Sequence, residues 1–219
     1  MTLSSSPKLI KGGLVVFAPG GGPLLHSIAL QYNPDTLTRN YQVQGVGGDG
    51  GGERAQPFRL KGPAIESIKV EAEVDATDQL EFPDSHATAV AFGIAPQLAA
   101  LEALINPSVD ELLNNAAATA NGTLEILPPE APLVLFVWSA SRVVPVRVTE
   151  LSITEEAFDP NLNPLRAKVS LGLRVLSTDD LGFQHKGGTL FLAHLRTREA
   201  LATKAGGATL ASLGLSSLP

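Results

Sequence analysis

The sequence has no cysteine and is poor in aromatic and charged residues. Of its 219 residues, 5% are aromatic and 17% are Asp, Glu, Lys or Arg, against about 25% charged residues in an average soluble domain. The absence of cysteine excludes disulfide bonds, thiolate metal ligands and a thiol nucleophile. With 16 basic and 22 acidic residues the formal net charge is −6, which argues against binding nucleic acid through a basic surface.

The low charged fraction has two interpretations, and composition alone does not separate them. One is a bias of the source toward small, uncharged residues, since the chain holds 21 glycines. The other is that much of the surface is buried in an assembly, because a free monomer normally exposes more charge.

Long apolar runs are absent as well. The longest strongly apolar run, Leu133–Trp138, is far shorter than the roughly 20 residues of a membrane-spanning helix. The segment Met1–Pro7 has neither the basic nor the apolar part of a secretory signal. We therefore expect a cytoplasmic protein that does not insert into a membrane.

Apolar and polar residues alternate along most of the chain, which is the period of a half-buried β-strand. The run 133–138 lacks this alternation and is predicted to be buried on both faces. The pattern predicts a mainly β fold, either a sandwich or an open barrel. The predicted strands are Leu14–Phe17, Ser27 to the turn at Asn33, Ile68–Val74, Leu133–Trp138 and Ala167–Val175.

One strand changes phase along its length. Val146 and Val148 are in one phase, whereas Leu151 and Ile153 are in the other. Because a slip of one residue turns side chains to the opposite face, we predict a β-bulge or a crossing between sheets near Thr149–Glu150.

A helical insertion is predicted between about residues 95 and 120. Pro96–Ile105 combines helix formers with apolar residues at helical spacing. Ser108 and Glu111 fit a capping box that starts a second helix, through about Thr119. A helix is also expected from Leu190 to about Lys204. We accordingly divide the chain into a β domain, 1–177, and a C-terminal extension, 178–219, that is partly helical or flexible.

Candidate catalytic and ligand-binding motifs are weak. The four histidines lack metal-ligand spacing. Glu155 and Glu156 are adjacent, so on a strand they point to opposite faces, and with Asp159 they fit an acidic contact surface better than a catalytic pair. The glycine strings lack the Gly-Lys-Ser/Thr ending of a phosphate-binding loop. We expect no enzymatic activity, no cofactor and no metal.

Two strings carry turn chemistry, because Asn and Asp side chains hydrogen-bond nearby backbone and Pro fixes φ. The first is Tyr32-Asn33-Pro34-Asp35. The second runs Phe158-Asp159-Pro160-Asn161-Leu162-Asn163-Pro164-Leu165-Arg166-Ala167.

The order of these strings, with a Pro-rich lead into an apolar strand ending at Trp138, resembles the tube and baseplate adaptor proteins of contractile injection systems, the phage-tail-like particles of bacteria. The resemblance covers roughly residues 8–177. It departs from the family at Leu162, where the family has Gly, and after Trp138, where Ser139 replaces Gly. The residues after 177 are also too few and too rich in Gly and Ala for the LysM module that many members carry.

The resemblance implies a structural protein with a tail-tube-type β fold, whose barrel is completed across the subunits of a ring. The implied ring is six-fold and joins the inner tube to the hub and spike, beside other baseplate subunits, in the bacterial cytoplasm. The alternative is a monomeric β-sandwich that recognises a ligand. The residues implied to carry the family's structure are Tyr32, Asn33, Pro34, Trp138, Phe158, Asp159, Pro160, Pro164, Leu165 and Arg166.

Two glycine-rich loops become candidate contacts between rings in this context, although simple surface loops remain an alternative. Ordering glycine-rich backbone carries a large entropic cost, so such loops order best against a neighbour. Under the resemblance, burial between subunits is the favoured explanation of the low charged fraction. The charged faces of the strands at 68–74 and 166–174 would line the lumen or meet a neighbour. The candidate loop residues are Gly20, Gly21, Gly22, Gly47, Gly48, Asp49 and Gly50.

Overall fold

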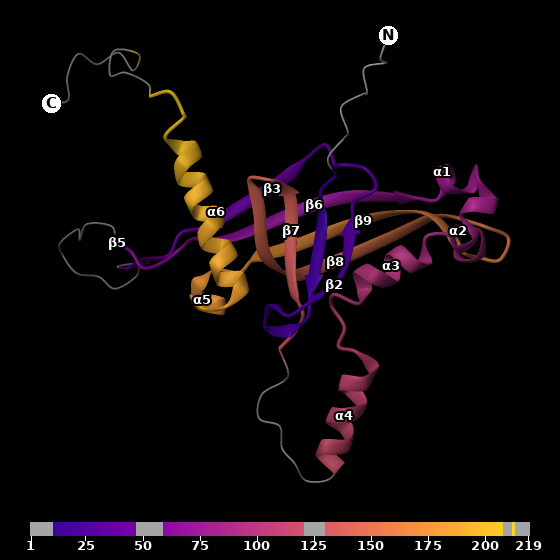
Figure 1. The fold of residues 1–219 in the computed structure, drawn as a ribbon. Coiled ribbons are helices and arrows are strands. Elements are labelled where there is room, and N and C mark those ends of the chain that lie inside the picture. Colours follow the sequence, from indigo (N-terminus) through magenta and orange to yellow (C-terminus); the bar gives the residue numbers. More distant parts are fainter. Residues whose placement is uncertain (1–10, 47–58, 121–129, 208–211, 213–219) are drawn as a thin grey trace, which may run out of the picture.

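The computed structural model describes residues 11–46, 59–120, 130–207 and 212 (Figure 1). Seven strands form one antiparallel sheet in the order β2-β1-β7-β8-β9-β6-β3, and β4 pairs with β5 in a separate ribbon. The predicted mainly β fold is confirmed. The strands are β1 (Gly13–Phe17), β2 (Leu24–Ala29), β3 (Leu37–Gln42), β4 (Gly45–Val46), β5 (Arg59–Leu60), β6 (Ile65–Asp75), β7 (Leu133–Ser139), β8 (Arg142–Phe158) and β9 (Pro164–Val175).

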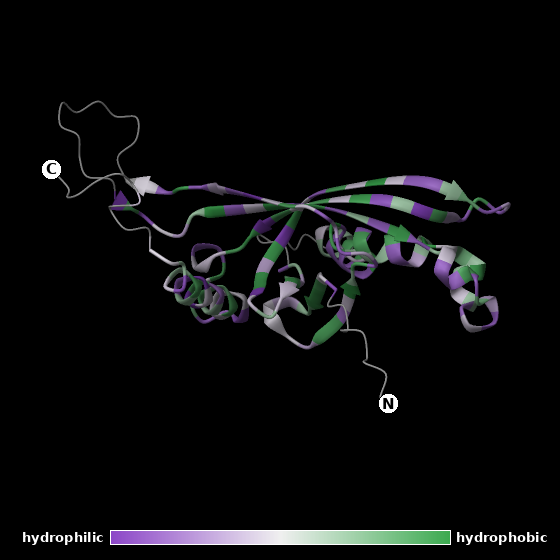
Figure 2. Cartoon of the chain, turned by 90° about the horizontal axis from the view of Figure 1, so that it is seen from above, coloured by the Kyte–Doolittle hydropathy of each residue, from purple (hydrophilic) through white to green (hydrophobic). Residues whose placement is uncertain are grey.

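The sheet encloses a core on one side only. In Figure 2 the long strands form one layer, and the helices lie on one side of it. Strand β8 connects the long strands β9 and β6 to the shorter strands β7, β1 and β2, because its first residues pair with β7 and its remaining length pairs with β9. The core therefore collects side chains from all of these elements, among them Phe136, Leu171 and Ile68, each 1% exposed, and Phe191 at 4%.

The predicted strand faces are confirmed where the alternation is strict. In β6, Ile68, Val70 and Ala72 are buried and the charged residues between them are exposed. The predicted bulge is also confirmed: pairing passes from Val148 with Leu173 to Glu150 with Gly172, which leaves Thr149 without a partner in the ladder.

Strand β2 and its neighbour β3 depart from the sequence prediction. Strand β2 ends at Ala29 rather than near Tyr32, because the side chain of Gln31 bonds to Asp75 of β6 instead of continuing along β1. Strand β3, of sequence LTRNYQ, was not predicted, since it holds too few apolar residues to show an alternating pattern.

The helical part starts earlier than residue 95. Helices α1 (Thr77–Leu80), η2 (Pro83–Ser85) and α2 (Ala87–Phe92) precede α3 (Ala95–Glu102) and α4 (Val109–Ala120). The first three are too short for a full hydrophobic period, so no periodic pattern predicts them. The predicted capping box is confirmed: the Glu111 N–H donates to Ser108 Oγ at 3.2 Å, and the Ser108 N–H donates to Glu111 Oε2 at 2.7 Å.

The C-terminal part packs against the same core. Helix α5 (Thr178–Leu181) leads to α6 (Lys186–Ala202), which begins before the predicted Leu190. Glycine is required at its start, because a Cβ atom on Gly188 would lie 1.9 Å from the Gly182 carbonyl oxygen. Phe191 of α6 then enters the core.

Candidate assembly surfaces

The first turn string fixes the connection between β2 and β3. The Gly12 N–H donates to Asn33 Oδ1 at 2.9 Å. The hydroxyl of Tyr32 donates to Asp78 Oδ2 at 3.2 Å. Gln31 bonds through its side chain to both the N–H and the carbonyl of Asp75. Tyr32 and Asn33, the latter directly before Pro34, thus tie this connection to the start of β1 and to α1.

Trp138, at the end of β7, lies against the same residue, Gly12. Its ring stacks on Phe136 with centroids 5.8 Å apart. A Cβ atom on Gly12 would lie 2.9 Å from Trp138 Cε3. Two of the family-motif residues, Asn33 and Trp138, therefore converge on Gly12, where only a small residue fits.

The second string forms the turn between β8 and β9. Asp159 Oδ1 accepts the N–H groups of Asn161 and Asn163, each at 2.8 Å, and Asp159 Oδ2 accepts the Asn163 side-chain amide. These hydrogen bonds from Asn163 and Asn161 hold the pKa of the Asp159 carboxyl below its usual value. The turn chemistry predicted for the string is present in the structure.

The same string attaches the helical part to the sheet. The Pro164 carbonyl accepts the Ile94 N–H at 2.8 Å, and the Leu165 carbonyl accepts the Ala76 N–H at 2.9 Å. Arg166 Nε donates to Asp75 Oδ2 at 2.7 Å. Burial raises the pKa of Asp75, but hydrogen bonds from Thr77 and Arg166 outweigh burial and hold that pKa below its usual value. Phe158 and Pro160 of the string stay exposed.

Leu162 occupies a backbone conformation that suits glycine. Its φ is +65° and its side chain is 78% exposed, so the side chain gains little from packing. The left-handed region costs a non-glycine residue about 1–2 kcal/mol, and glycine in turn loses about 0.5–1 kcal/mol of backbone entropy.

We therefore expect Leu162→Gly to raise the free energy of unfolding by about 0.5–1 kcal/mol, measured by urea denaturation. The matched control is Ala157→Gly in the adjoining strand, which should lower stability by a similar amount. A loss of stability in Leu162→Gly would show that the turn does not strain Leu162.

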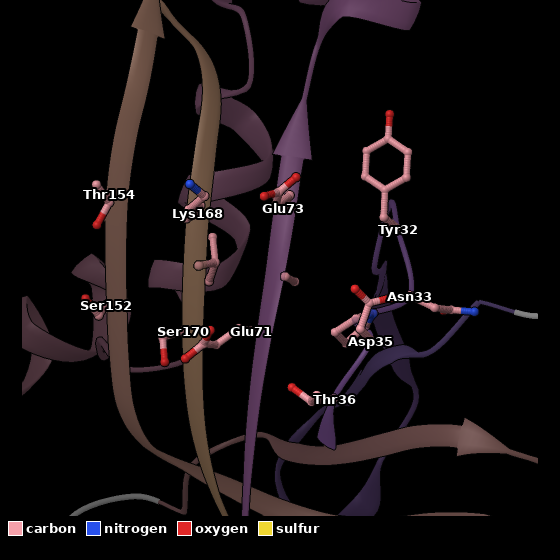
Figure 3. A pocket seen from close by; sticks show the side chains of 13 residues that line it. Tyr32, Asn33, Asp35, Thr36, Glu71, Glu73, Ser152, Thr154, Lys168 and Ser170 are labelled. Atoms are coloured by element: carbon pink, nitrogen blue, oxygen red, sulfur yellow. The ribbon is translucent and has the colours of Figure 1, made fainter. Parts of the chain in front are cut away.

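A hollow of about 470 Å³ lies between the first turn string and the polar face of the sheet. In Figure 3, the segment from Tyr32 to Thr36 lies on one side of β6, and polar side chains of β8 and β9 lie on the other. Lys168 of this face binds Glu156 at 2.8 Å. The hollow is a polar surface rather than an enclosed reaction site. The polar side chains that line it are Tyr32, Asn33, Asp35, Thr36, Glu71, Glu73, Ser152, Thr154, Lys168 and Ser170.

The sheet has two outer strands, β2 and β3. In the part of the chain that the structure describes, no strand pairs with the outer side of either one. Leu24 and Leu25 of β2 are 58% and 52% exposed, and Tyr41 of β3 is 40% exposed. Unpaired edges with exposed apolar side chains are surfaces on which another strand can add.

A cluster of three arginines, which we call the basic cluster, borders β3. It consists of Arg39, Arg142 and Arg198 around the carboxylate of Glu66, which is 5% exposed. Arg39 Nη1 and Arg198 Nη1 lie 3.7 Å and 3.6 Å from the Glu66 oxygens. The Tyr41 hydroxyl donates to Glu66 Oε1 at 2.7 Å. Burial, and then the neighbouring charge of Arg39, lowers the pKa of Arg142.

His194 lies beside the basic cluster and adds no charge to it at neutral pH. Its ring is 6% exposed, and its Nδ1 has no hydrogen-bond partner among the described residues. Burial, and then Arg198, lowers the pKa of His194, so the imidazole is neutral near pH 7. Sequence reasoning missed this cluster, although one signal existed: Glu66 falls in phase with the buried Ile68 and Val70.

The candidate inter-ring loops are only partly described. Gly20, Gly21 and Gly22 form a tight turn with positive φ at the first two. Lys186 holds the turn, since its Nζ donates to the Gly21 carbonyl and lies 3.6 Å from the centre of the Phe17 ring. The other candidates, Gly47, Gly48, Asp49 and Gly50, lie outside the described residues. A role of either loop between rings stays a prediction.

No group of three or more His, Asp or Glu side chains within the described ranges is arranged to hold a metal ion. Among the helices described, none is long and apolar enough to cross a membrane.

Comparison with known proteins gave a family match. The model of the family described as "Contractile injection system tube protein" matches residues 19–183. No curated protein matched the sequence. One similar solved structure is "Tail of empty GTA particle computed with helical refinement, C6 symmetry", with 12% identity over 79% of this chain and 95% of that chain. Its TM-score is 0.29, which is too low to support an argument about fold or assembly.

Proposed function

The chain belongs to the family of contractile injection system tube proteins, and from this we propose that it forms a ring that joins the inner tube of such a particle to its hub and spike. It is a structural component of the system, and its mainly β fold with a small helical part fits a tail-tube-type protein. The proposed ring is made of six copies at the baseplate. Its other proposed partners are the inner tube protein, the hub and spike, and neighbouring baseplate subunits.

The observation that carries the ring is the pair of outer strands at opposite ends of one continuous sheet, with whose outer sides no other described strand pairs. If β3 of one copy meets β2 of the next, each contact covers two different edges, which makes it heterologous. Heterologous contacts that close by rotation generate rings. A closed ring would leave no sheet edge open, as in a barrel completed across subunits.

The force of sheath contraction would act on such a ring mechanically. The ring would need tight closure and axial contacts rather than an active site, and it would assemble in the bacterial cytoplasm. The alternative, a monomeric ligand-recognition module, is not favoured, because the family match covers most of the chain and describes a tube protein.

A lysine on an outer strand tests the ring. Leu25 of β2 is 52% exposed, and Leu112 of α4, at 54%, is a matched control on a helix that lies away from the sheet (Figure 1). We expect the wild type and Leu112→Lys to form rings, seen as a multiple of the 22.8 kDa subunit mass by native mass spectrometry and as rings by negative-stain imaging. Leu25→Lys should remain a folded monomer, because lysine on an edge strand blocks strand pairing. A wild type that stays monomeric over a wide concentration range contradicts the proposal.

A further inference from the structure

We propose that the contact between copies is an electrostatic match, in which the basic cluster beside β3 of one copy binds an acidic segment beside β2 of the next. The acidic segment consists of Asp78, Glu81 and Asp84 on α1 and η2. This inference rests on the proposed ring and names the chemistry that joins its subunits. The partner is a second copy of this chain.

The basic side of the contact carries an unbalanced positive charge. Three arginines surround one carboxylate, and His194 is neutral near pH 7. Arg142 makes no ion pair with any carboxylate of the described residues. The side chains of Arg39 and Arg198 are 32% and 42% exposed, so their charges can be reached from outside. Cations in excess over their partners are stabilised by an added anion.

The acidic side carries the opposite imbalance. Asp78, Glu81 and Asp84 are all exposed, and none forms an ion pair with a lysine or arginine of the described ranges. The nearby cations of this end of the sheet, Arg166 and Lys168, are already paired with Asp75 and Glu156. No lysine or arginine of the described residues therefore neutralises the acidic segment.

The two surfaces flank the two outer strands. Arg39 belongs to β3 itself, and Glu66 is directly opposite Tyr41 in the ladder. On the other side, residues 27–29 of β2 and Asp78 line one groove of about 610 Å³, and Tyr32 ties α1 to the end of that strand through Asp78. Figure 1 shows α1 and α6 toward opposite ends of the long strands. A contact of β3 with β2 of another copy would thus bring a basic and an acidic surface to the same interface.

This complementarity identifies the occupant as another copy. The chain has an overall charge of −6, so a second copy is net acidic and offers a segment that matches the basic cluster. Because the two surfaces differ, they cannot pair with themselves, and only a head-to-tail arrangement satisfies both. Opposite potentials also suppress the wrong orientation, since like charges would then face each other.

Reversal of charge at each side, followed by mixing, tests the match. The basic-side variant carries Arg142→Glu and Arg198→Glu, and the acidic-side variant carries Glu81→Lys and Asp84→Lys. Each variant alone would bring like charges together, and we expect its self-association constant to fall at least tenfold in sedimentation velocity. An equimolar mixture should recover association, because each variant offers the surface that the other needs.

The controls are charge reversals away from the two surfaces. Arg196→Glu, on another side of α6, and Asp110→Lys, in α4, should associate like the wild type. Wild-type association should also weaken as sodium chloride is raised from about 50 to 500 mM, because salt screens charge pairs. Melting temperatures close to that of the wild type show that each variant is folded.

The outcomes separate this inference from the ring itself. Lost association in both variants with recovery in the mixture supports the electrostatic match. If the variants still form rings, or if the mixture of the two variants does not recover association, the electrostatic match is wrong. The proposed ring is then still supported, provided that the wild type forms one. If the wild type forms no ring at all, the proposed function fails first.

Discussion

Replacement of Phe136 with alanine should lower the free energy of unfolding by about 3–5 kcal/mol. Phe136 is 1% exposed and lies in β7, an inner strand of the sheet between β1 and β8. It packs in the core with residues of β6, β9 and α6. Alanine there would leave a cavity that the surrounding strands cannot close, because both neighbours of β7 are fixed by ladder hydrogen bonds.

Urea denaturation followed by far-ultraviolet circular dichroism measures this loss. Phe82, which is 62% exposed between α1 and η2, is the matched control, and Phe82→Ala should change stability by no more than about 0.5 kcal/mol. Equal effects of Phe136→Ala and Phe82→Ala would contradict the core assignment.

From the sequence we expect Trp138→Ala to lower the free energy of unfolding by about 3–5 kcal/mol if Trp138 is a core residue. Since the structure places Trp138 half-buried beside Phe136, we expect a smaller loss of stability there than at Phe136.

The sequence best predicts those features that depend only on neighbouring residues. The alternation in β6 and β9, the change of phase at Thr149 and the capping box at Ser108 each depend on residues within a few positions. Local sequence determines such features because the side-chain period of a strand and the first turn of a helix are local geometries. The turn at Asp159 belongs to the same class.

The features that sequence does not predict depend on tertiary contacts. Strand β3 exists because β6 offers it an edge, and its own residues carry little apolar pattern. The short helix α1 is held through Asp75 and the Leu165 carbonyl, which lies far away in the sequence. Propensity is a weak guide where such contacts decide the structure.

The candidate contact surfaces fall between these cases. The family-motif residues could be named from sequence, and their contacts show a structural reason for each string, as at Gly12 and at the Pro164 carbonyl. The basic cluster could not be named, because Arg39, Arg142 and Arg198 come from three separate elements. Only Glu66 gave a signal in the sequence, because it is a charged residue at a position where the alternating pattern predicts a buried side chain. Some of the few charged residues of the chain thus lie in the basic cluster and the acidic segment, the two surfaces that we propose to pair.

Replacement of Glu66 with alanine should lower the free energy of unfolding by about 1–3 kcal/mol. The Glu66 carboxylate is the one anion that the described structure places among Arg39, Arg142 and Arg198. Its removal would leave three cations facing one another and the Tyr41 hydroxyl without its acceptor. The loss stays below that of a fully buried ion pair, because the side chains of Arg39 and Arg198 are 32% and 42% exposed and water screens their charges.

Two matched variants separate charge from size. Glu71 lies on the exposed face of the same strand, so Glu71→Ala should change stability by no more than about 0.5 kcal/mol. Glu66→Gln keeps the size and an acceptor for Tyr41, and its loss should fall between the two. Arg142→Gln should cost less than Glu66→Ala, because it removes one of three like charges, although the electrostatic match predicts that it weakens association. If Glu66→Ala is as stable as Glu71→Ala by chemical denaturation, the basic cluster does not depend on its central carboxylate and the charge imbalance that we infer is already neutralised.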